Sequence, residues 1–480
     1  MRERSFVGRR RELTSLSRRL ELVTEDRRGT AVTIRGRRQV GKSRLVEQFC
    51  HDADTPYVYF QASRGVSTTE SLGEFVTTIR ESSLPRGADI PAGPPGNWLE
   101  AFKLLALVLP AGTPSIVVVD ELPWLLQQDP HLEGQLQTAW DRHLSSRPLL
   151  LILVGSDLQM MAAFVGYDRP FYGRSDQLVI GPLNPAETAA MTGLSGSDAL
   201  DAYLITGGFP GLCRVWRPGL PPQDFLAAEC EDPASPLLTV GESMVNSEFP
   251  NPDQTRRVLE AIGHGERTFG NIAHAAGSAP GTPVKAGALG PVLRRLQEKQ
   301  AISADTPLAT IPGNGGKLYR VADTYLRLYL AVLARAHEDT RRDRPDLALR
   351  RIRRQWESWR GRAIEPVVRE ALSRAAAAES LPWPRAEAVG GWWPRNFDPE
   401  IDLVGADRAP VARTVFYTGS IKWLETAFDH HDYAALARDS ARVPGIAERD
   451  AGLVVVSRSG VRPGLSVSVV WGPDDVLAAW

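Results

Sequence analysis

The chain has only three cysteines, Cys50, Cys213 and Cys230, among its 480 residues. Their wide spacing excludes a disulfide framework and also the closely spaced cysteine pairs that bind structural metals. Because free thiols persist in reducing compartments, we expect the protein to be cytoplasmic.

Long apolar runs are also missing from the sequence. No segment approaches the roughly 18 uninterrupted apolar residues that a membrane-spanning helix needs. The initial segment MRERSFVGRRRELTSL carries positive charges without an apolar stretch behind them, which argues against a secretory signal. We therefore expect no contact with a membrane.

A net charge of either sign is the third feature that the chain lacks. Its 56 basic and 57 acidic residues give a formal charge of -1. This balance excludes a global attraction to nucleic acid, so any contact of that kind must be local. The length of 480 residues exceeds what one hydrophobic core usually organises, and we expect about two to four domains.

The first part of the chain alternates apolar runs with amphipathic segments. Short apolar runs between turns are typical of buried strands, and apolar residues at helical spacing indicate helices. Such alternation predicts an α/β fold with a parallel sheet covered by helices. The predicted strands are 31–36, 57–62, 115–120 and 148–155, and the predicted helices include 9–24, 42–50, 98–109 and 131–144. Ser67 and Glu70 form a capping-box signature before a further helix.

Residues 36–43 read GRRQVGKS and match the phosphate-binding pattern G-x-x-x-x-G-K-[ST]. Gly36 and Gly41 permit a tight turn whose backbone N–H groups converge on a phosphate at the positive end of the following helix. Lys42 would neutralise the β- and γ-phosphate oxygens, and the Ser43 hydroxyl is a suitable ligand for Mg²⁺. A glycine-rich turn can match this pattern by chance, but here a strand precedes the loop and a helix follows it.

The motif therefore predicts a site for ATP with Mg²⁺. Its nucleotide-binding residues are expected to be Gly36, Arg37, Arg38, Gln39, Val40, Gly41, Lys42, Ser43 and Arg44.

A second element supports hydrolysis as well as binding. The segment SIVVVDELPWL places Asp120 and Glu121 at the end of an apolar strand, which is the Walker B arrangement. Asp120 would hold a magnesium-bound water, and Glu121 would act as the general base on the attacking water. Two solvated acids at a strand end are the alternative interpretation, but one that is less expected after a P-loop.

Further motifs extend this interpretation along most of the chain. FVGRRREL, LLLILVGSDLQMM, RPFYGRSDQLVIGPL and LITGGFP, together with the two Walker motifs, resemble the archaeal-type ATPases of the AAA+ and STAND group. The resemblance implies that FVGRRREL packs near the adenine and that Ser156 senses the γ-phosphate. It also implies that Pro210 belongs to a nucleotide-contacting element of a lid.

Arg174 is, by the same resemblance, a candidate arginine finger. A guanidinium that reaches the γ-phosphate stabilises the charge that spreads during phosphoryl transfer. If a neighbouring copy supplies the finger, the protein must self-associate when it binds ATP. An ATP-dependent homo-oligomer is therefore one expected assembly. A surface ion pair is the alternative role for Arg174.

The segment from residue 254 onward predicts three helices, a strand, a glycine-rich tip and another strand, which is the order of a winged helix-turn-helix. Basic side chains near the third helix and the tip suit contacts with the phosphates of double-stranded DNA. The candidates for DNA contact are Lys285, Arg294, Arg295, Lys299 and Lys317. Winged helices also serve as rigid connectors, and the Arg-dense run that follows could be a solvated helix face.

The last segment restarts an alternation of helices and strands. The resemblance implies a fold similar to PD-(D/E)XK nucleases, with Glu365, Asp402 and Lys422 as the matching residues. A carboxylate usually precedes the lysine by two positions, but Ser420 stands there. Because Mg²⁺ affinity depends on the number of carboxylates, we expect a degenerate domain that does not cleave, with an active Mg²⁺-dependent nuclease as the alternative.

These observations lead to one main hypothesis and two alternatives. The main hypothesis is an ATP-hydrolysing switch that acts on or with DNA. The alternatives are a nucleotide-gated endonuclease and a slow regulatory ATPase with protein partners only. The expected domains are a P-loop ATPase core at 1–183, a helical lid at 184–250, a winged helix at 251–335, a basic linker helix at 336–360 and a restriction-endonuclease-like α/β domain at 361–480.

Overall fold

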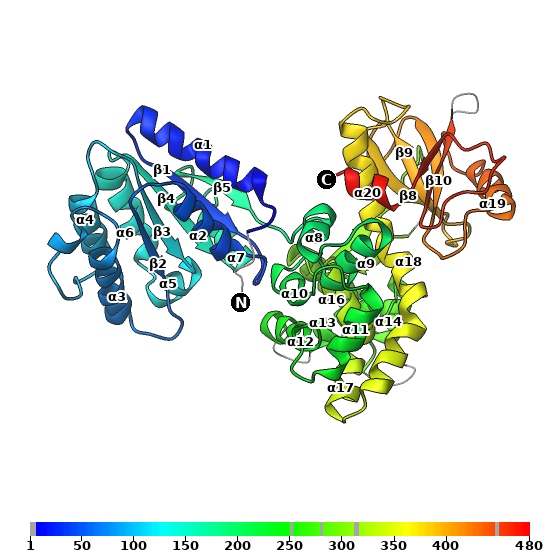
Figure 1. The fold of residues 1–480 in the computed structure, drawn as a ribbon, viewed down its shortest axis with the longest axis horizontal. Coiled ribbons are helices and arrows are strands. Elements are labelled where there is room, and N and C mark those ends of the chain that lie inside the picture. Colours follow the sequence, from blue (N-terminus) through cyan, green and yellow to red (C-terminus); the bar gives the residue numbers. More distant parts are fainter. Residues whose placement is uncertain (1–5, 250–252, 279–281, 312–315, 447–450) are drawn as a thin grey trace. The chain divides into compact units, whose positions relative to one another are not determined.

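The computed structural model describes residues 6–249, 253–278, 282–311, 316–446 and 451–480 (Figure 1). The chain divides into two compact units, residues 1–183 and 184–480. The division falls at the end that we expected for the ATPase core. Each unit is described by itself below.

The first unit is built on a five-stranded sheet with the strand order β2-β3-β4-β1-β5, in which all neighbours are parallel. The two interior strands β3 and β4 are buried along their whole length, as their continuous apolar sequences predict. The predicted α/β fold is therefore confirmed. The strands are β1 (Thr30–Arg35), β2 (Tyr57–Gln61), β3 (Ser115–Asp120), β4 (Leu149–Gly155) and β5 (Ser175–Val179).

Strand β5 was not predicted from the sequence. The structure identifies it as a strand by its parallel pairing with β1. As an edge strand it carries mostly exposed side chains, such as Val179 at 57% exposure. Its sequence SDQLV therefore lacks the apolar run that identified the interior strands.

Helices surround this sheet, and α3, α4 and α6 are grouped together in Figure 1. Their core is aromatic: Phe75 lies edge-on to Phe60, Trp98 and Phe102, with ring centroids 5.2, 5.6 and 5.7 Å apart. The predicted capping box of Ser67 and Glu70 starts α3. The helices are α1 (Arg10–Asp26), α2 (Lys42–Asp52), α3 (Thr68–Glu81), η1 (Gly87–Asp89), α4 (Trp98–Val108), α5 (Leu122–Gln128), α6 (Leu132–Ala139), η2 (Trp140–Leu144) and α7 (Leu158–Phe164).

The second unit begins with short helices, followed by three helices and an antiparallel strand pair. The helices of the expected lid are α8 (Pro185–Thr192), α9 (Gly196–Thr206), α10 (Pro210–Val215), α11 (Pro222–Glu231) and α12 (Pro236–Glu248). The segment expected to form a winged helix contains α13 (Gln254–Gly263), α14 (Phe269–Ala275), α15 (Ala286–Glu298), β6 (Ile302–Asp305), β7 (Leu318–Val321), α16 (Thr324–Leu328) and η3 (Tyr329–Leu333). The order of these elements agrees with the sequence pattern.

The expected linker helix and the first helix of the last domain are one continuous helix. After α17 (Ala334–Arg341), helix α18 spans Pro345–Ala377 over 33 residues. Its buried positions run from Ala348 to Ala376, and no break occurs at the boundary that we placed at residue 361. Gly361 and Pro366 both disfavour a helix interior, and packing of the buried face along the whole length compensates for them.

The last part of the chain forms a second five-stranded sheet with the order β12-β11-β10-β9-β8. Strands β8, β9 and β10 are antiparallel neighbours, whereas β10, β11 and β12 are parallel neighbours. A helix thus precedes three antiparallel strands, and α19 joins them to a parallel strand. The elements are β8 (Ala388–Trp392), β9 (Ile401–Ala406), β10 (Val415–Lys422), α19 (His430–Ser440), β11 (Gly452–Ser457), β12 (Val469–Trp471) and α20 (Pro473–Ala478).

The lid helix α9 and the last domain share one hydrophobic core. Leu200 and Leu204 of α9 belong to the same buried cluster as Ile364 and Val368 of α18 and Val456 of β11. Helix α20 also packs on α9. The expected lid and the expected C-terminal domain are therefore physically joined, although they are far apart in the sequence.

Candidate nucleotide site

The P-loop connects β1 to α2 in a conformation that depends on its two glycines. A Cβ atom at Gly36 would lie 2.3 Å from the carbonyl oxygen of Ile180, so any side chain there would clash with backbone. Gly41 caps α2 with φ of 88°, a left-handed conformation that favours glycine. Both constraints keep these two positions without side chains, in a loop whose backbone N–H groups must approach a phosphate.

Lys42 is the first residue of α2, and its side chain lies almost fully inside the site at 5% exposure. Its ammonium donates a hydrogen bond to the carbonyl oxygen of Arg37 at 2.9 Å. Burial lowers the pKa of Lys42, while the nearby carboxylates of Glu121 and Asp120 oppose that shift. The lysine is thus held over the loop, close to both Walker B acids.

Asp120 ends β3 and is 1% exposed. Its Oδ2 accepts a hydrogen bond from the Tyr59 hydroxyl at 2.8 Å, and its Oδ1 accepts one from the backbone N–H of Glu121 at 2.9 Å. Tyr59 also interacts with the side chain of Ser43, and burial beside Asp120 raises the pKa of Tyr59. The three side chains Ser43, Tyr59 and Asp120 therefore form one oxygen-lined group.

Tyr59 was missed by the sequence analysis. It lies on β2, and the pairing of β2 with β3 in the sheet brings it to Asp120. Only knowledge of that strand neighbour could have identified it.

The hydroxyl and carboxylate of Ser43 and Asp120 fit Mg²⁺, which prefers oxygen ligands. Among the residues that the structure describes, no group of three or more His, Cys, Asp or Glu side chains is placed to hold a metal ion. Because Mg²⁺ commonly takes only one or two protein ligands and fills the rest with water and phosphate oxygens, such a sparse set is sufficient.

Glu121 follows β3 with a left-handed backbone, φ 55°. Its Oε2 accepts a hydrogen bond at 2.8 Å from the hydroxyl of Ser156, which directly follows β4. Strand β4 lies between β1 and β3, so parallel pairing brings the ends of all three strands to one edge of the sheet. The structure thus gathers Lys42, Asp120, Glu121 and Ser156, which the sequence indicated from three separate segments.

The segment FVGRRREL is anchored to the P-loop by Arg9. This side chain, 4% exposed, donates hydrogen bonds to the carbonyl oxygen of Val40 at 2.9 Å and to that of Gly181 at 2.6 Å. The left-handed backbone of Arg9, φ 60°, starts α1 at this point. The segment therefore lies beside the loop, and its contact with adenine stays a prediction.

Arg174 forms a paired ion contact with Asp141 of η2. Its Nε and Nη2 donate to the two carboxylate oxygens at 2.8 and 2.9 Å, and this contact raises the pKa of Arg174 and lowers that of Asp141. The structure thus holds Arg174 in the surface ion pair that was the alternative to a finger role. A finger role would require this pair to open.

Pro210 is the first residue of α10 and follows Gly207 and Gly208, which have φ of 60° and 71°. It belongs to the second unit, and its contact with nucleotide stays a prediction.

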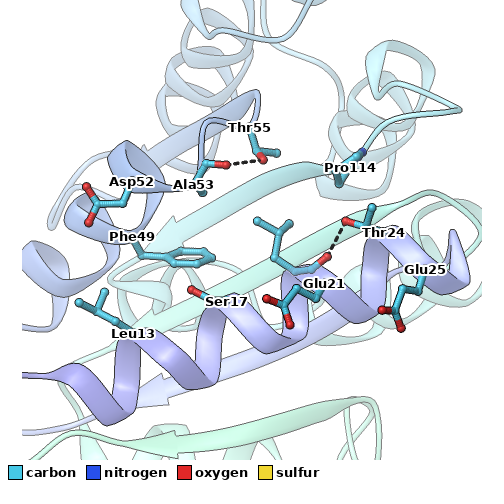
Figure 2. A pocket seen from close by; sticks show the side chains of 11 residues that line it. Leu13, Ser17, Glu21, Thr24, Glu25, Phe49, Asp52, Ala53, Thr55 and Pro114 are labelled. Carbon is cyan, nitrogen blue, oxygen red and sulfur yellow. Dashed lines mark hydrogen bonds between the residues drawn. The ribbon is translucent and has the colours of Figure 1, made fainter.

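A hollow of about 450 Å³ lies between α1 and α2, away from the P-loop. Figure 2 shows Leu13 and Ser17 of α1 facing Phe49 of α2, with Glu21 and Asp52 at the edge. Helix α2 has 11 residues, so Asp52 lies about 15 Å along the helix axis from Lys42. The predicted nucleotide-site residues do not line this hollow.

The C-terminal domain holds a separate cavity of about 490 Å³, and Glu365, Asp402 and Lys422 all line it. Helix α18 and strands β9 and β10 thus bring together the three residues that the resemblance indicated. Asp402 accepts hydrogen bonds from the backbone N–H of Ile421 at 2.8 Å and from the Ser420 hydroxyl at 3.1 Å. Burial raises the pKa of Asp402.

The charges in this cavity are already partnered within the protein. Burial and the neighbouring Asp402 raise the pKa of Glu365 to about 7, so near neutral pH its carboxyl is partly protonated. Lys422 pairs with Asp432, and Glu400 pairs with Arg267 at 2.8 Å. Ser420 stands where the resemblance led us to expect a further carboxylate, and its hydroxyl is bonded to Asp402.

The predicted DNA contacts divide into two groups. Lys285, Arg294, Arg295 and Lys317 are exposed. Lys299 instead lies over the ring of Phe249 at 5.1 Å and donates to the carbonyl oxygen of Glu248 at 3.4 Å. Lys299 is therefore used in packing inside the unit.

The segment around the expected wing packs on the C-terminal domain. The backbone N–H of Leu308 donates to Gly391 at 2.8 Å, and that of Ala412 donates to Ala309 at 3.0 Å. The indole of Trp393 donates to the carbonyl oxygen of Gly316 at 2.8 Å. The glycine-rich tip between them, 312–315, lies outside the described residues.

Comparisons with known proteins agree with this architecture. Residues 5–153 match the family described as AAA ATPase domain, and residues 329–433 match a family of archaeal and bacterial proteins of unknown function. The chain therefore carries an AAA ATPase domain followed by a domain of that second family. No helix in the described part of the chain is long and apolar enough to cross a membrane.

Two kinds of relative were found. An uncharacterized protein of Methanocaldococcus jannaschii is 25% identical over 406 residues, 83% of this chain and 84% of that protein. Among solved structures, a Walker-type ATPase of Pyrococcus abyssi is 20% identical with a TM-score of 0.47, covering 68% of this chain and 96% of its own. The ORC2 protein of Aeropyrum pernix, in ADPNP–ADP complexes, is 14% identical with a TM-score of 0.48. The match covers 71% of this chain and 97% of the ORC2 chain.

Proposed function

We propose that the protein is an ATP-driven molecular switch that binds ATP with Mg²⁺ and hydrolyses it. The observation that carries this proposal is the hydrogen bond between Ser156 and Glu121 at 2.8 Å, beside Lys42 and Asp120. These side chains come from three strand ends and meet at one sheet edge, where open α/β sheets bind their ligands.

Each residue has a part in the proposed reaction. The P-loop backbone and Lys42 bind the phosphates, and Glu121 accepts a proton from the attacking water. Ser156 holds the Glu121 carboxylate in one orientation. Mg²⁺, bound by Ser43 and through water by Asp120, would neutralise charge on the phosphate oxygens.

The second unit is the proposed output of the switch. A lid that responds to nucleotide would carry the C-terminal domain with it, because Leu200 and Leu204 of α9 are buried in the core of that domain. ATP would also promote self-association if Arg174 leaves Asp141 and serves a neighbouring copy.

We propose that the second unit binds DNA. The exposed Arg294 and Arg295 on α15 support contacts with phosphates. The wing segment packs on the C-terminal domain, which supports a DNA contact through α15 alone and not through the wing. The same packing also favours a second candidate function, that of a regulatory ATPase whose winged-helix segment makes contacts only within the protein.

We further propose that the C-terminal domain does not cleave DNA. The support is the donor set itself, in which Ser420 replaces a carboxylate and the pKa of Glu365 is raised to about 7. Plasmid nicking assays in Mg²⁺ or Mn²⁺ test this proposal. Nicking that is abolished by Asp402→Ala would contradict it.

Measuring phosphate release with and without duplex DNA tests the switch. The wild-type protein should release phosphate, and DNA should change the rate. An absence of DNA effect with normal hydrolysis would favour the regulatory ATPase over the DNA-linked switch.

A further inference from the structure

Two exposed arginines of the ATPase domain share one aromatic ring. The guanidinium carbons of Arg38 and Arg64 lie 5.6 and 5.0 Å from the ring centroid of Trp124. Arg38 belongs to the P-loop, Arg64 follows β2, and Trp124 lies on α5, three residues after Glu121. We name these three residues the Trp124 cluster.

The cluster is attached to the Walker B segment by backbone and side-chain hydrogen bonds. The N–H of Ala62, at the start of the Arg64 loop, donates to the carbonyl oxygen of Asp120 at 2.9 Å. Gln128 of α5 donates to the carbonyl oxygens of Ser63 and Val66 at 3.2 and 3.0 Å. These contacts fix the loop that carries Arg64 to the helix that carries Trp124.

The two arginines concentrate positive charge without an acidic partner. Within residues 6–249, neither guanidinium forms an ion pair with a carboxylate. The two guanidinium groups are both positively charged and repel each other. Cation–π contact with a half-buried indole holds both charges in place, and an anion would complete the arrangement.

The position of the cluster indicates which anion. Arg38 is close enough to Lys42 to lower its pKa, so its charge acts on the same space as the P-loop lysine. Arg64 follows the end of β2, next to the end of β3 that carries Asp120 and Glu121. Both charges therefore lie on the side of the site where the terminal phosphate and the attacking water are expected.

We propose that Arg38 and Arg64 bind the terminal phosphate of ATP, with Trp124 as the positioning residue that holds them. This inference rests on the proposed function and adds a source of positive charge from within the same chain. It gives the site a way to distinguish ATP from ADP without the Arg174 guanidinium, which is bound to Asp141.

Binding of ATP and of ADP, each with Mg²⁺, tests the proposal by calorimetry in a Glu121→Gln background that suppresses hydrolysis. Arg38→Ala and Arg64→Ala should each raise the Kd for ATP on the order of tenfold and change the Kd for ADP less than about twofold. Trp124→Leu should act like the arginine variants, whereas Trp124→Phe should retain most of the preference for ATP. Arg86→Ala is the matched control, because Arg86 is exposed and pairs with Asp89 at 2.9 Å.

Equal weakening of ATP and ADP, or no change in either Kd, would overturn the proposal. An unchanged nucleotide preference combined with weaker binding of a 20-bp DNA duplex would overturn it as well, since the phosphates bound would then be those of DNA. The variant Lys42→Ala distinguishes a failure of the proposed nucleotide site from a failure of the proposed role of the Trp124 cluster. If Lys42→Ala still binds both nucleotides, the proposed nucleotide site itself is wrong, whatever the cluster variants show.

Discussion

At the scale of single residues, the candidate site depends on side chains that orient one another. Ser156 can bond Glu121 because Gly155 lets β4 end close to its neighbours. A Cβ atom at Gly155 would lie 2.5 Å from the sulfur of Met161 and 2.8 Å from Cδ of Pro123. The serine is thus fixed at the point where the carboxylate of the general base needs a donor.

Replacing Ser156 by alanine should lower the rate of hydrolysis but not the affinity for ATP. Without the donor at 2.8 Å, the Glu121 carboxylate samples orientations that do not meet the water. We expect kcat to fall roughly 10- to 100-fold with little change in the Kd for ATP. Steady-state phosphate release and equilibrium binding measure the two quantities, with the exposed Thr113→Ala as control. An equal loss in affinity would contradict the orienting role.

Replacing Glu365 by glutamine should stabilise the protein at alkaline pH. The pKa of Glu365 is raised from 4.5 to about 7, so the native state binds a proton that the unfolded state has lost between these values. Stability from this group therefore falls as pH rises from about 4.5 to 7.

The glutamine variant cannot ionise and should match the wild type at pH 5. At pH 8 it should be more stable by about 2 to 3 kcal/mol. Urea unfolding at both pH values measures the difference. A glutamine variant that is less stable than the wild type at pH 8 would show that the ionised carboxylate is well solvated or well paired.

At the scale of elements, the sequence predicted the site better than its surroundings. GRRQVGKS and the apolar run before Asp120 identified β1, α2 and β3, because loop geometry and burial leave few alternatives at those positions. Arg64 and Trp124 carried no such local signal, since their contact depends on the packing of α5 beside the end of β2. Strand β8 was missed because its sequence AVGGW is short and contains two glycines.

The expected DNA-binding helix gives a prediction at this scale. The double variant Arg294→Ala and Arg295→Ala should weaken binding of duplex DNA, because both side chains are exposed on α15. Each lost phosphate contact should reduce the slope of log Kd against log salt by about one. Fluorescence anisotropy at several salt concentrations measures both effects, with Arg86→Ala as control.

An unchanged affinity and slope in the double variant would remove α15 as the DNA contact. Lys299 serves as an internal comparison. Its contacts with Phe249 and Glu248 predict that Lys299→Ala affects stability more than DNA binding.

At the scale of the whole molecule, the parts of the second unit are joined by a partly buried ion network as well as by their core. Asp201 of α9 pairs with Arg360 of α18 and with Arg458, each at 3.2 Å. Glu425 pairs with the same two arginines, each at 3.0 Å. The lid and the C-terminal domain therefore share charged contacts that neither could satisfy alone.

The substitution Arg360→Met should destabilise the second unit. It leaves Asp201, whose side chain is 4% exposed, with Arg458 as its one remaining counter-charge in the network. The free energy of unfolding should fall by about 3 kcal/mol. Thermal unfolding followed by circular dichroism measures this, with the exposed Glu379→Gln as control. A loss of stability no larger than that of the control would mean that the ion network contributes little to the contact between the lid and the C-terminal domain.

The central claim is that Lys42 and Glu121 make this chain an ATP-hydrolysing enzyme, and its most direct test is the release of phosphate from ATP with Mg²⁺. The account predicts release by the wild type, loss of both binding and release in Lys42→Ala, and retained ATP binding with release reduced at least about 100-fold in Glu121→Gln. Release by Glu121→Gln at the wild-type rate would contradict the assigned base. No release by the wild type, with or without duplex DNA, would contradict the switch itself.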